Sequence, residues 1–489
     1  MDSIYKGYPF GAIILWRTKS QLRAERQLGP FVLPERDPDY PIDYVLDGQQ
    51  RLTSIFGVFQ TELGHDVKID WNKIYFDMEA GPEPQESWFS ALPDGGVDPS
   101  RHFPIGTFFD TTAYRQATNT LDEDRAKRID EVQAVFKEAA LPVQSLETDD
   151  RSKVAIVFER VNRLGVELDV FMLLSAWTWS EEFDLQSEFK AFAGELEEFG
   201  FEDIGDDTNL LLRCCASVVA RDPAPGAVIG LSGTEVRERF DEIKNGMRGA
   251  IDFLRANLRI EKLQNLPYPA LLVPLTVFFA TPDGQSVSLT DLQRRQLLSW
   301  FWKSCFSRRF SAGVLTKLRR DIRAARDLRE SGAVGLAEIA VTLEADFFSD
   351  NRFTISTVNT KTFVLMLAQS EPLSFVSGSP IGLRDVMMSY NRREFHHCFP
   401  RAYLARQGRE SADINRLANF VFLSAQDNKT LGGVAPSKYR ERMAGEHVPA
   451  VLERALCPAV LFEDDYDRFI EVRAKRLLDG ANKLMAQTD

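Results

Sequence analysis

The stretch VLDGQQRLTSIFGVF, residues 45–59, decides how the first third of the chain is expected to fold. Its first letters end the apolar run IDYVLDG, which is typical of a short buried strand that stops at Gly48. Gly48 permits a tight turn, because glycine lacks a Cβ and tolerates unusual backbone angles. Beyond it the apolar residues recur at helical spacing, at Leu52, Ile55, Phe56 and Phe59. The stretch therefore predicts a strand that passes through a glycine turn into a helix.

The turn gathers polar side chains at the start of this helix. Helix N-termini bind phosphate through free N–H groups and through the helix dipole. Arg51 can donate two hydrogen bonds to a phosphate, and Asp47 can bind a cation or position a water molecule. Gln49 and Gln50 can orient a nucleophilic water or contact a base. The alternative is a helix start with solvated polar residues, and the pattern alone leaves both interpretations open.

On both sides of this stretch, strand and helix patterns alternate. PFGAIILW, KIYFDM and SKVAIVFERVN are rich in β-formers and predict strands, whereas Pro, Gly and Ser in residues 80–104 predict a linker. Later segments such as LTDLQRRQLLSWFWKSCF and VLTKLRRDIRAARDLRES have helical patterns, and the chain ends in another, YDRFIEVRAKRLLDGANKLM. We therefore predict an α+β multidomain protein with a mixed region 1–175, a helical region 176–375 and a C-terminal region 376–489.

Composition limits the class of protein. The 489 residues include 72 acidic and 59 basic side chains, so the net charge is −13, which excludes a generic basic nucleic-acid coat. Contact with DNA would need a local basic surface. The five cysteines form no CxxC pair and predict reduced thiols. The N-terminal apolar run FGAIILW is too short for a membrane span, so we expect a cytoplasmic protein of bacterial type without a membrane partner.

A second candidate site surrounds the two adjacent histidines of REFHHCFPRAYL, residues 392–403, in a chain that has only five histidines. His396 and His397 end a predicted strand, and NFVFLSA, from Asn419, predicts a second one. A polar turn and a helix are expected next, at Asn428. A histidine base and a cation held by imidazole and amide oxygen suit phosphodiester hydrolysis. The alternative is a chance pair with one buried and one exposed histidine.

The charge around the histidine pair supports contact with phosphate. Residues 391–443 hold ten basic and five acidic side chains, so this window carries +5 in a chain of −13. The basic residues are Arg392, Arg393, Arg401, Arg406, Arg409, Arg416, Lys429, Lys438, Arg440 and Arg442.

The segment HHCFPRAYL…DINRLANFVFLSAQDNKTLGGVAPSKY resembles the C-terminal HNH nuclease domain of GmrSD-type restriction endonucleases. The resemblance implies a ββα-metal fold in which His396 binds a metal ion and His397 is the general base. It also implies that Asn419 orients the loop and that Asn428 is the second metal ligand. Cys398 departs from the pattern, because a β-branched residue is common there.

DGQQR resembles the signature of the N-terminal half of the same family, which is similar to the ParB and sulfiredoxin fold. By that resemblance Asp47, Gly48, Gln49, Gln50 and Arg51 bind a nucleoside triphosphate, GTP or ATP. FERVNRLGVELDVFMLLSA resembles a later segment of that half, in which Arg160, Asn162 and Gly165 help to build the same pocket. Family members usually carry an opening strand before the first helix, so we expect this chain to be truncated at its N-terminus.

The resemblance implies a DNA endonuclease of a bacterial anti-phage or restriction system. It would cut modified foreign DNA with Mg²⁺ or Mn²⁺, and nucleotide binding or hydrolysis at DGQQR would regulate it; a homo-oligomer is compatible with this. The alternative hypothesis is a non-hydrolytic DNA or nucleotide sensor, or a scaffold subunit that acts with a partner. Nucleotide binding by the purified chain separates the two.

Three other features favour structural roles. Residues 303–330 hold nine basic and three acidic side chains, which favours a solvated helix face over a DNA path. The aromatic cluster Trp300, Phe301 and Trp302 favours a helix-packing core over a base-stacking platform. The neighbours Cys214 and Cys215 are likewise expected in the core.

Overall fold

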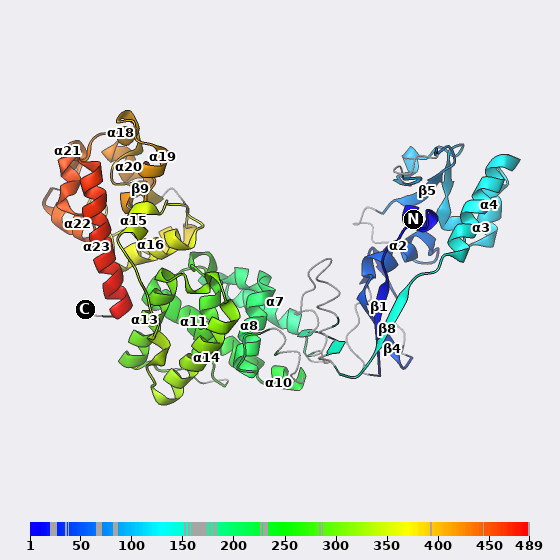
Figure 1. Ribbon diagram of the computed structural model, residues 1–489, viewed down its shortest axis with the longest axis horizontal. Coiled ribbons are helices and arrows are strands. Elements are labelled where there is room, and N and C mark those ends of the chain that lie inside the picture. Colours follow the sequence, from blue (N-terminus) through cyan, green and yellow to red (C-terminus); the bar gives the residue numbers. More distant parts are fainter. Residues whose placement is uncertain are drawn as a thin grey trace. The chain divides into compact units, whose positions relative to one another are not determined.

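The computed structural model divides into two compact units, Met1–Trp179 and Ser180–Asp489, and both contain helices and short strands (Figure 1). The protein is thus of mixed α and β type, as predicted. Whether residues 176–375 and 376–489 are separate domains stays a prediction. The structure describes residues 1–19, 27–34, 37, 39–64, 71–81, 87–150, 153–154, 157, 174–175, 178, 183–224, 227, 233–282, 285, 287–391, 394–443 and 445–487.

The first sheet of unit 1 contains the predicted strand before the glycine turn. Its central strand is β1 (Ile13–Thr18), which pairs antiparallel with β4 (Ile42–Asp47) and parallel with β8 (Val143–Glu147). Trp16 is buried on β1 against Leu46, and its indole N–H donates to the carbonyl of Thr148 at 2.7 Å. Helix α2 (Gln49–Phe59) follows β4 directly, so the predicted strand–turn–helix is confirmed.

A second sheet has the order β6-β5-β7, with β5 (Lys73–Asp77) antiparallel to β6 (Phe89–Leu92) and to β7 (His102–Pro104). The predicted linker 80–104 is therefore wrong over β6 and β7. Both edge strands form because their backbones hydrogen-bond to β5. The local content of Pro and Gly does not predict this pairing. The turn α1 (Asp2–Tyr5), η2 (Ile105–Thr107) and the helices α3 (Thr111–Thr118) and α4 (Glu123–Glu138) surround its apolar core. A small hairpin joins β2 (Gln27–Leu28) to β3 (Phe31–Val32).

The strand predicted for SKVAIVFERVN is wrong at its described residues. Lys153, Val154 and Val157 are helical. The reason is a local cap: the Asp150 carboxylate accepts the backbone N–H of Lys153 at 3.3 Å, and its carbonyl accepts that of Val154 at 3.2 Å. A capping aspartate starts a helix even where β-formers follow.

Unit 2 is mainly helical, and the helices predicted over 289–306, 314–331 and 466–485 are confirmed, the first of them beginning at Asp291. Helix α12 (Leu272–Phe279) is its centre: every residue of α12 is buried, and α8 (Thr208–Val219), α11 (Phe240–Leu258) and α14 (Val314–Ser331) pack against it. The helices that the structure describes in unit 2 are α7 (Leu185–Glu195), α8 (Thr208–Val219), α10 (Gly233–Glu238), α11 (Phe240–Leu258), α12 (Leu272–Phe279), α13 (Asp291–Phe306), α14 (Val314–Ser331), α15 (Asp346–Asp350), α16 (Val358–Gln369), α17 (Leu383–Ser389), α18 (Arg401–Arg406), α19 (Ser411–Ile414), α20 (Ala425–Leu431), α21 (Pro436–Tyr439), α22 (Val448–Arg454) and α23 (Tyr466–Ala486).

The aromatic cluster on α13 is part of the core, as predicted, because Trp300, Phe301 and Trp302 are buried. The indole N–H of Trp300 donates to the buried Asp321 carboxylate at 3.1 Å. Arg309 binds the same carboxylate with two hydrogen bonds, of 2.7 and 2.8 Å. The buried acid is thus paired, which buried charges require.

Other structural expectations also agree with the described residues. Cys214 and Cys215 are buried on α8, and burial raises the pKa of the Cys214 thiol to about 12. On α14, Arg319 pairs with Asp222 and Arg326 with Asp327, as on a solvated helix face. No helix in the described part of the chain is long and apolar enough to cross a membrane.

The close contact between α11 and α12 gives the first prediction. A Cβ at Gly246 would lie 2.4 Å from the Thr276 carbonyl oxygen, so Gly246→Ala forces the two helices apart. We expect the free energy of unfolding to fall by about 1–3 kcal/mol, measured by urea titration. The control is Gly194→Ala on α7, where a Cβ meets nothing within 4 Å and should stabilise by up to about 1 kcal/mol. Equal effects of both substitutions would contradict this account of the packing.

Candidate functional site

The histidine pair lies in a strand–strand–helix segment of unit 2. Strand β9 (Phe395–His397) pairs antiparallel with β10 (Phe420–Phe422), and Phe420 lies opposite His397. Helix α20 follows β10 and starts at the N-cap Ser424, whose hydroxyl accepts the backbone N–H of Asp427 at 3.0 Å. Apolar residues beneath the strands hold them, with the rings of Phe353 and Phe420 stacked 4.1 Å apart. Both strands and the helix thus form where the sequence predicts them.

His397 is half-buried, and two neighbours fix its ring. Its imidazole packs on the Phe420 ring, with 4.2 Å between centroids. Its Nε2 lies 3.0 Å from Oδ1 of Asn415. The amide of Asn415 donates from Nδ2 to the carbonyl and hydroxyl of Ser411, so its Oδ1 is placed to accept a hydrogen bond from the Nε2–H tautomer of His397. In the neutral ring, Nδ1 is then the nitrogen with a lone pair.

Asn415 is a residue of the site that was not expected from the sequence. It lies in the quoted segment DINRLANF, 18 residues after His397. Asn415 is a third asparagine in a segment where Asn419 and Asn428 were already expected to belong to the site. Its position in the sequence alone does not distinguish it from an ordinary turn residue.

Asn419 is fully buried and holds the loop that follows the histidines. Its Oδ1 accepts the backbone N–H of Phe399 at 2.9 Å. Its Nδ2 donates to the carbonyl of Ile414 at 2.9 Å and to that of Phe399 at 3.3 Å. The backbone carbonyl of Asn419 also accepts the N–H of Cys398 at 2.7 Å. These contacts are those of a residue that orients a loop, the role that the family resemblance implies.

His396 and Asn428, the two predicted metal ligands, lie on different elements of this segment. His396 is half-buried on β9 opposite Val421, and Asn428 is half-buried on α20. Successive strand residues point to opposite faces, so His396 and His397 diverge unless the strand end bends. Among the described residues, no group of three or more His, Cys, Asp or Glu is arranged to hold a metal ion. The metal site stays a prediction.

A buried arginine clamps the same loop from below. Arg473 of α23 is fully buried. Its Nη1 donates to the carbonyl of Ala418 at 2.6 Å and to Sγ of Cys398 at 3.1 Å, and its Nη2 donates to the carbonyl of Ala455 at 3.1 Å. The hydroxyl of Tyr439 donates to the carbonyl of Cys398 at 2.8 Å. The residue after His397 is therefore held from three sides.

The guanidinium of Arg473 also acts on a pair of buried thiols. Sγ of Cys398 lies 3.6 Å from Sγ of Cys457. Burial tends to raise the pKa of Cys457, but the hydrogen bond from Cys398 and the charges of Arg473 and Arg476 outweigh it and lower the pKa from 9.0 to about 7. Burial raises the pKa of Cys398 well above 9.0. Cys457 is thus the thiol of this pair that ionises first as the pH rises.

The lowered pKa of Cys457 predicts a pH-dependent stability. Between about pH 7 and 9 the unfolded chain binds a proton at residue 457 that the folded chain has lost, so the free energy of unfolding rises with pH there. We expect a rise of at most about 2–3 kcal/mol, which Cys457→Ser abolishes. Urea unfolding at pH 6.5 and 9 measures it.

The control is Cys305→Ser, because burial raises the pKa of Cys305 well above 9.0 and its thiol stays neutral throughout this window. The same pH dependence in wild type and Cys457→Ser would contradict the assignment.

The predicted basic window is partly engaged within the protein. Arg392 and Arg393 lie outside the described residues. Arg409 pairs with Asp467 and Arg416 with Asp413. Arg406 and Arg442 donate to backbone carbonyls, and Arg440 lies over the ring of Phe462. Among the described basic residues of the window, the exposed side chains are those of Arg401, Arg406, Lys429, Lys438, Arg440 and Arg442.

In unit 1, the DGQQR turn brings Arg51 back onto the first sheet. Gly48 caps α2 with φ of +97°, the left-handed conformation that favours glycine. Nη1 of Arg51 donates to the carbonyl of Ala12 at 2.8 Å and lies 3.1 Å from the Asp47 carboxylate. Gln49 and Gln50 are exposed in the first turn of α2. The structure thus joins Asp47 to Arg51, whereas Arg160, Asn162 and Gly165 lie outside the described residues.

Gly11 shapes the place that Arg51 occupies. Its φ is +88°, and a Cβ there would lie 2.8 Å from Nη2 of Arg51. We expect Gly11→Ala to destabilise more than Gly7→Ala, by about 0.5–1.5 kcal/mol in urea unfolding, because the guanidinium has to shift and loses a hydrogen bond. Gly7 is the matched control, because its φ is +68° but its Cβ would meet nothing within 4 Å. A smaller effect at Gly11 would mean that Arg51 is not held at this position.

Comparison with known proteins gives a family match for the first unit. Residues 1–179 match the family model described as GmrSD restriction endonuclease, N-terminal domain. The resemblance predicted from DGQQR is thereby confirmed for this part of the chain. An uncharacterized protein of Methanocaldococcus jannaschii is 22% identical over an alignment that covers 98% of this chain and 89% of that protein. Similarity therefore extends into unit 2, with no stated function attached to it.

Proposed function

Since residues 1–179 carry the N-terminal domain of the GmrSD restriction endonucleases, we propose that this protein is a DNA endonuclease of a bacterial defence system. We place its nuclease site at the strand–strand–helix segment of His396, His397 and Asn428. One observation carries the proposal: Nε2 of His397 lies 3.0 Å from Oδ1 of Asn415, inside a loop clamped by Asn419. Such pre-orientation is what a general base requires.

In this mechanism His397 removes a proton from the attacking water. The lone pair at Nδ1 accepts that proton, while Asn415 stabilises the Nε2–H of the ring. The Phe420 ring limits rotation of the imidazole on its other side. Asn419 keeps the backbone after His397 in place, so the base does not have to be ordered during the reaction.

A divalent cation, Mg²⁺ or Mn²⁺, would be held by the imidazole of His396 and the amide oxygen of Asn428. This donor pair fits a hard or borderline cation, with water and phosphate oxygens as further ligands. When bound, it supplies charge stabilisation for the phosphate and the departing oxygen. The exposed Arg401, Lys429 and Lys438 would contact flanking phosphates, so DNA binding should weaken with salt.

The first unit would regulate the nuclease through GTP or ATP. The start of α2 has no side-chain cap among the described residues, so the N–H groups after Gly48 can bind a phosphate, and Gln49 and Gln50 are exposed beside them. Arg51 would exchange part of its contact with Asp47 for a phosphate, and Arg160 and Asn162 would join it. Modified or phage DNA is the proposed substrate, on the strength of the family resemblance. A sensor or scaffold subunit that cuts nothing remains the alternative function.

Plasmid cleavage by the purified chain tests this proposal. Plain and phage-modified DNA are incubated with Mg²⁺ or Mn²⁺, with and without GTP or ATP. We expect His397→Ala to lower the cleavage rate by about 10²–10⁴-fold, the usual contribution of a general base. His447→Ala is the control, because this exposed histidine lies outside the proposed site. Equal cleavage by His397→Ala and wild type refutes the assignment, and no wild-type cleavage favours the sensor.

Asn415 variants separate positioning from folding. Asn415→Ala should reduce the cleavage rate without changing DNA affinity, because only the orientation of His397 is lost. Asn415→Asp keeps an acceptor for the Nε2–H and should restore most of the rate. A parallel loss of rate and DNA affinity in both variants would show a structural role alone.

A further inference from the structure

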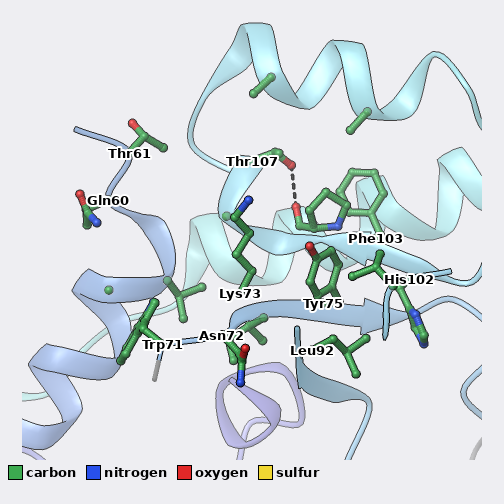
Figure 2. Close-up of a pocket in the computed structure, with 18 of the residues that line it drawn as sticks. Gln60, Thr61, Trp71, Asn72, Lys73, Tyr75, Leu92, His102, Phe103 and Thr107 are labelled. Carbon is green, nitrogen blue, oxygen red and sulfur yellow. Dashed lines mark hydrogen bonds between the residues drawn. The ribbon is translucent and has the colours of Figure 1, made fainter. Parts of the chain in front are cut away.

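A cavity of about 940 Å³ lies in unit 1, apart from the DGQQR turn. Its walls come from the end of α2, from β5, β7 and η2, and from α3, as Figure 2 shows. None of the residues 47–51 lines it. Small-molecule sites usually measure about 300–1,000 Å³, so this cavity is large enough for a ligand of several rings.

Aromatic side chains form a large part of the wall. Trp71, Tyr75, Phe31 and Phe103 line the cavity, and the rings of Phe31 and Trp71 meet edge to face at 5.4 Å. Gly57 of α2 sets the position of Trp71, since a Cβ there would lie 2.4 Å from the indole ring. Flat apolar walls of this kind suit a planar aromatic ligand.

The charges of the wall are one-sided. Among the described residues that line the cavity there is no aspartate or glutamate, although acidic residues outnumber basic ones in the whole chain. Among the described residues of the wall, Lys73 is the one lysine, and there is no arginine. Lys73 and Tyr75 lie two residues apart on β5, so they share a face, and both point into the space below Thr107 in Figure 2. A cation without a competing carboxylate favours an anionic group on the ligand.

Polar groups near Lys73 add hydrogen-bonding capacity. Thr61, Asn72 and Thr120 also line the cavity. The side chain of Gln60 is engaged with the backbone of Leu63, at 2.8 and 3.1 Å, and the Thr107 hydroxyl donates to the carbonyl of Pro104. The wall therefore combines aromatic faces, one cation and a few amides and hydroxyls, as in a site that fixes the orientation of a planar, charged ligand.

We propose that this cavity binds a nucleotide, with the base against the aromatic wall and a phosphate at Lys73. The nucleotide comes either from solution or from a DNA strand that extrudes one base into the cavity, as enzymes that examine single bases do. The second source rests on the proposed endonuclease function, whereas the first does not. In either case unit 1 has a nucleotide site separate from the DGQQR turn.

Equilibrium binding to the full chain tests the inference. GTP, ATP and 2′-deoxynucleoside 5′-monophosphates are titrated calorimetrically, and short DNA duplexes with and without a modified base are titrated in EDTA so that no cleavage occurs. Lys73→Met removes the charge, and Thr120→Trp fills the mouth of the cavity from an exposed position. Lys127→Met, an exposed lysine on α4, is the matched control. Thermal unfolding verifies that each variant is folded.

We expect both cavity variants to raise the Kd of the bound ligand about tenfold or more, and Lys127→Met to leave it unchanged. An effect on free nucleotides identifies the soluble source, and an effect on DNA alone identifies the extruded base. No effect on any ligand, or an equal effect of Lys127→Met, overturns the proposal. The proposal is also overturned if Arg51→Met abolishes nucleotide binding while Lys73→Met leaves it unchanged.

The outcome is separable from that of the proposed function, because binding is measured without cleavage. His397→Ala should bind these ligands like wild type. Binding that depends on Lys73 in a chain that cuts no DNA would support the cavity and refute the nuclease.

Discussion

The buried guanidinium of Arg473 is the interaction on which the histidine segment depends. It is fully buried, and its described partners are the carbonyls of Ala418, Ala455 and Leu456 and the thiol of Cys398, none of them a carboxylate. A buried cation is costly unless its donors are satisfied, so these acceptors have to keep their places. Two of them adjoin the proposed site, since Cys398 follows His397 and Ala418 precedes Asn419. The hydrogen bonds that satisfy the guanidinium of Arg473 therefore also fix the loop that follows His397.

The strands themselves could not supply this order. β9 and β10 have three residues each, and an isolated two-stranded ribbon is marginally stable at best. What fixes them are contacts from residues distant in sequence: Asn419 to Phe399, Tyr439 to Cys398, and α23 beneath them. The lowered pKa of Cys457 fits the same scheme, because the guanidinium groups of Arg473 and Arg476 favour the ionised form of that thiol.

Local sequence predicted the parts of this arrangement whose causes are local. The bounds of α14, the strand at the histidines and the strand that starts after Asn419 follow from periodicity and from β-formers. The edge strands β6 and β7 were missed, because their stability comes from pairing with β5 and not from their own composition. The helix at Lys153 was missed because one capping carboxylate, that of Asp150, outweighs a run of β-formers.

The partners of the site residues were harder still to predict. Arg473 contacts Cys398 across 75 positions, and Arg51 contacts Ala12 across 39. The cavity at Lys73 is built from segments between residues 31 and 121 and carries no motif. Such features arise from tertiary packing, so a single sequence shows the residues of a site more readily than the contacts that position them.

The polar contacts of Arg51 and those of Arg473 differ in their exposure to solvent, and this difference suggests which arginine can respond to a ligand. The Arg51–Asp47 pair is about one-third exposed, so water screens it and a phosphate can compete for the guanidinium at little cost. The donors of Arg473 are enclosed, and no ligand can replace their acceptors without exposing a buried charge. Regulation by a nucleotide is therefore physically easier at the turn of unit 1, where the partly exposed guanidinium of Arg51 lies against Gly11 and Gly48. A rigid clamp is better suited to the histidines, because a general base is effective only when its orientation is fixed before the substrate arrives.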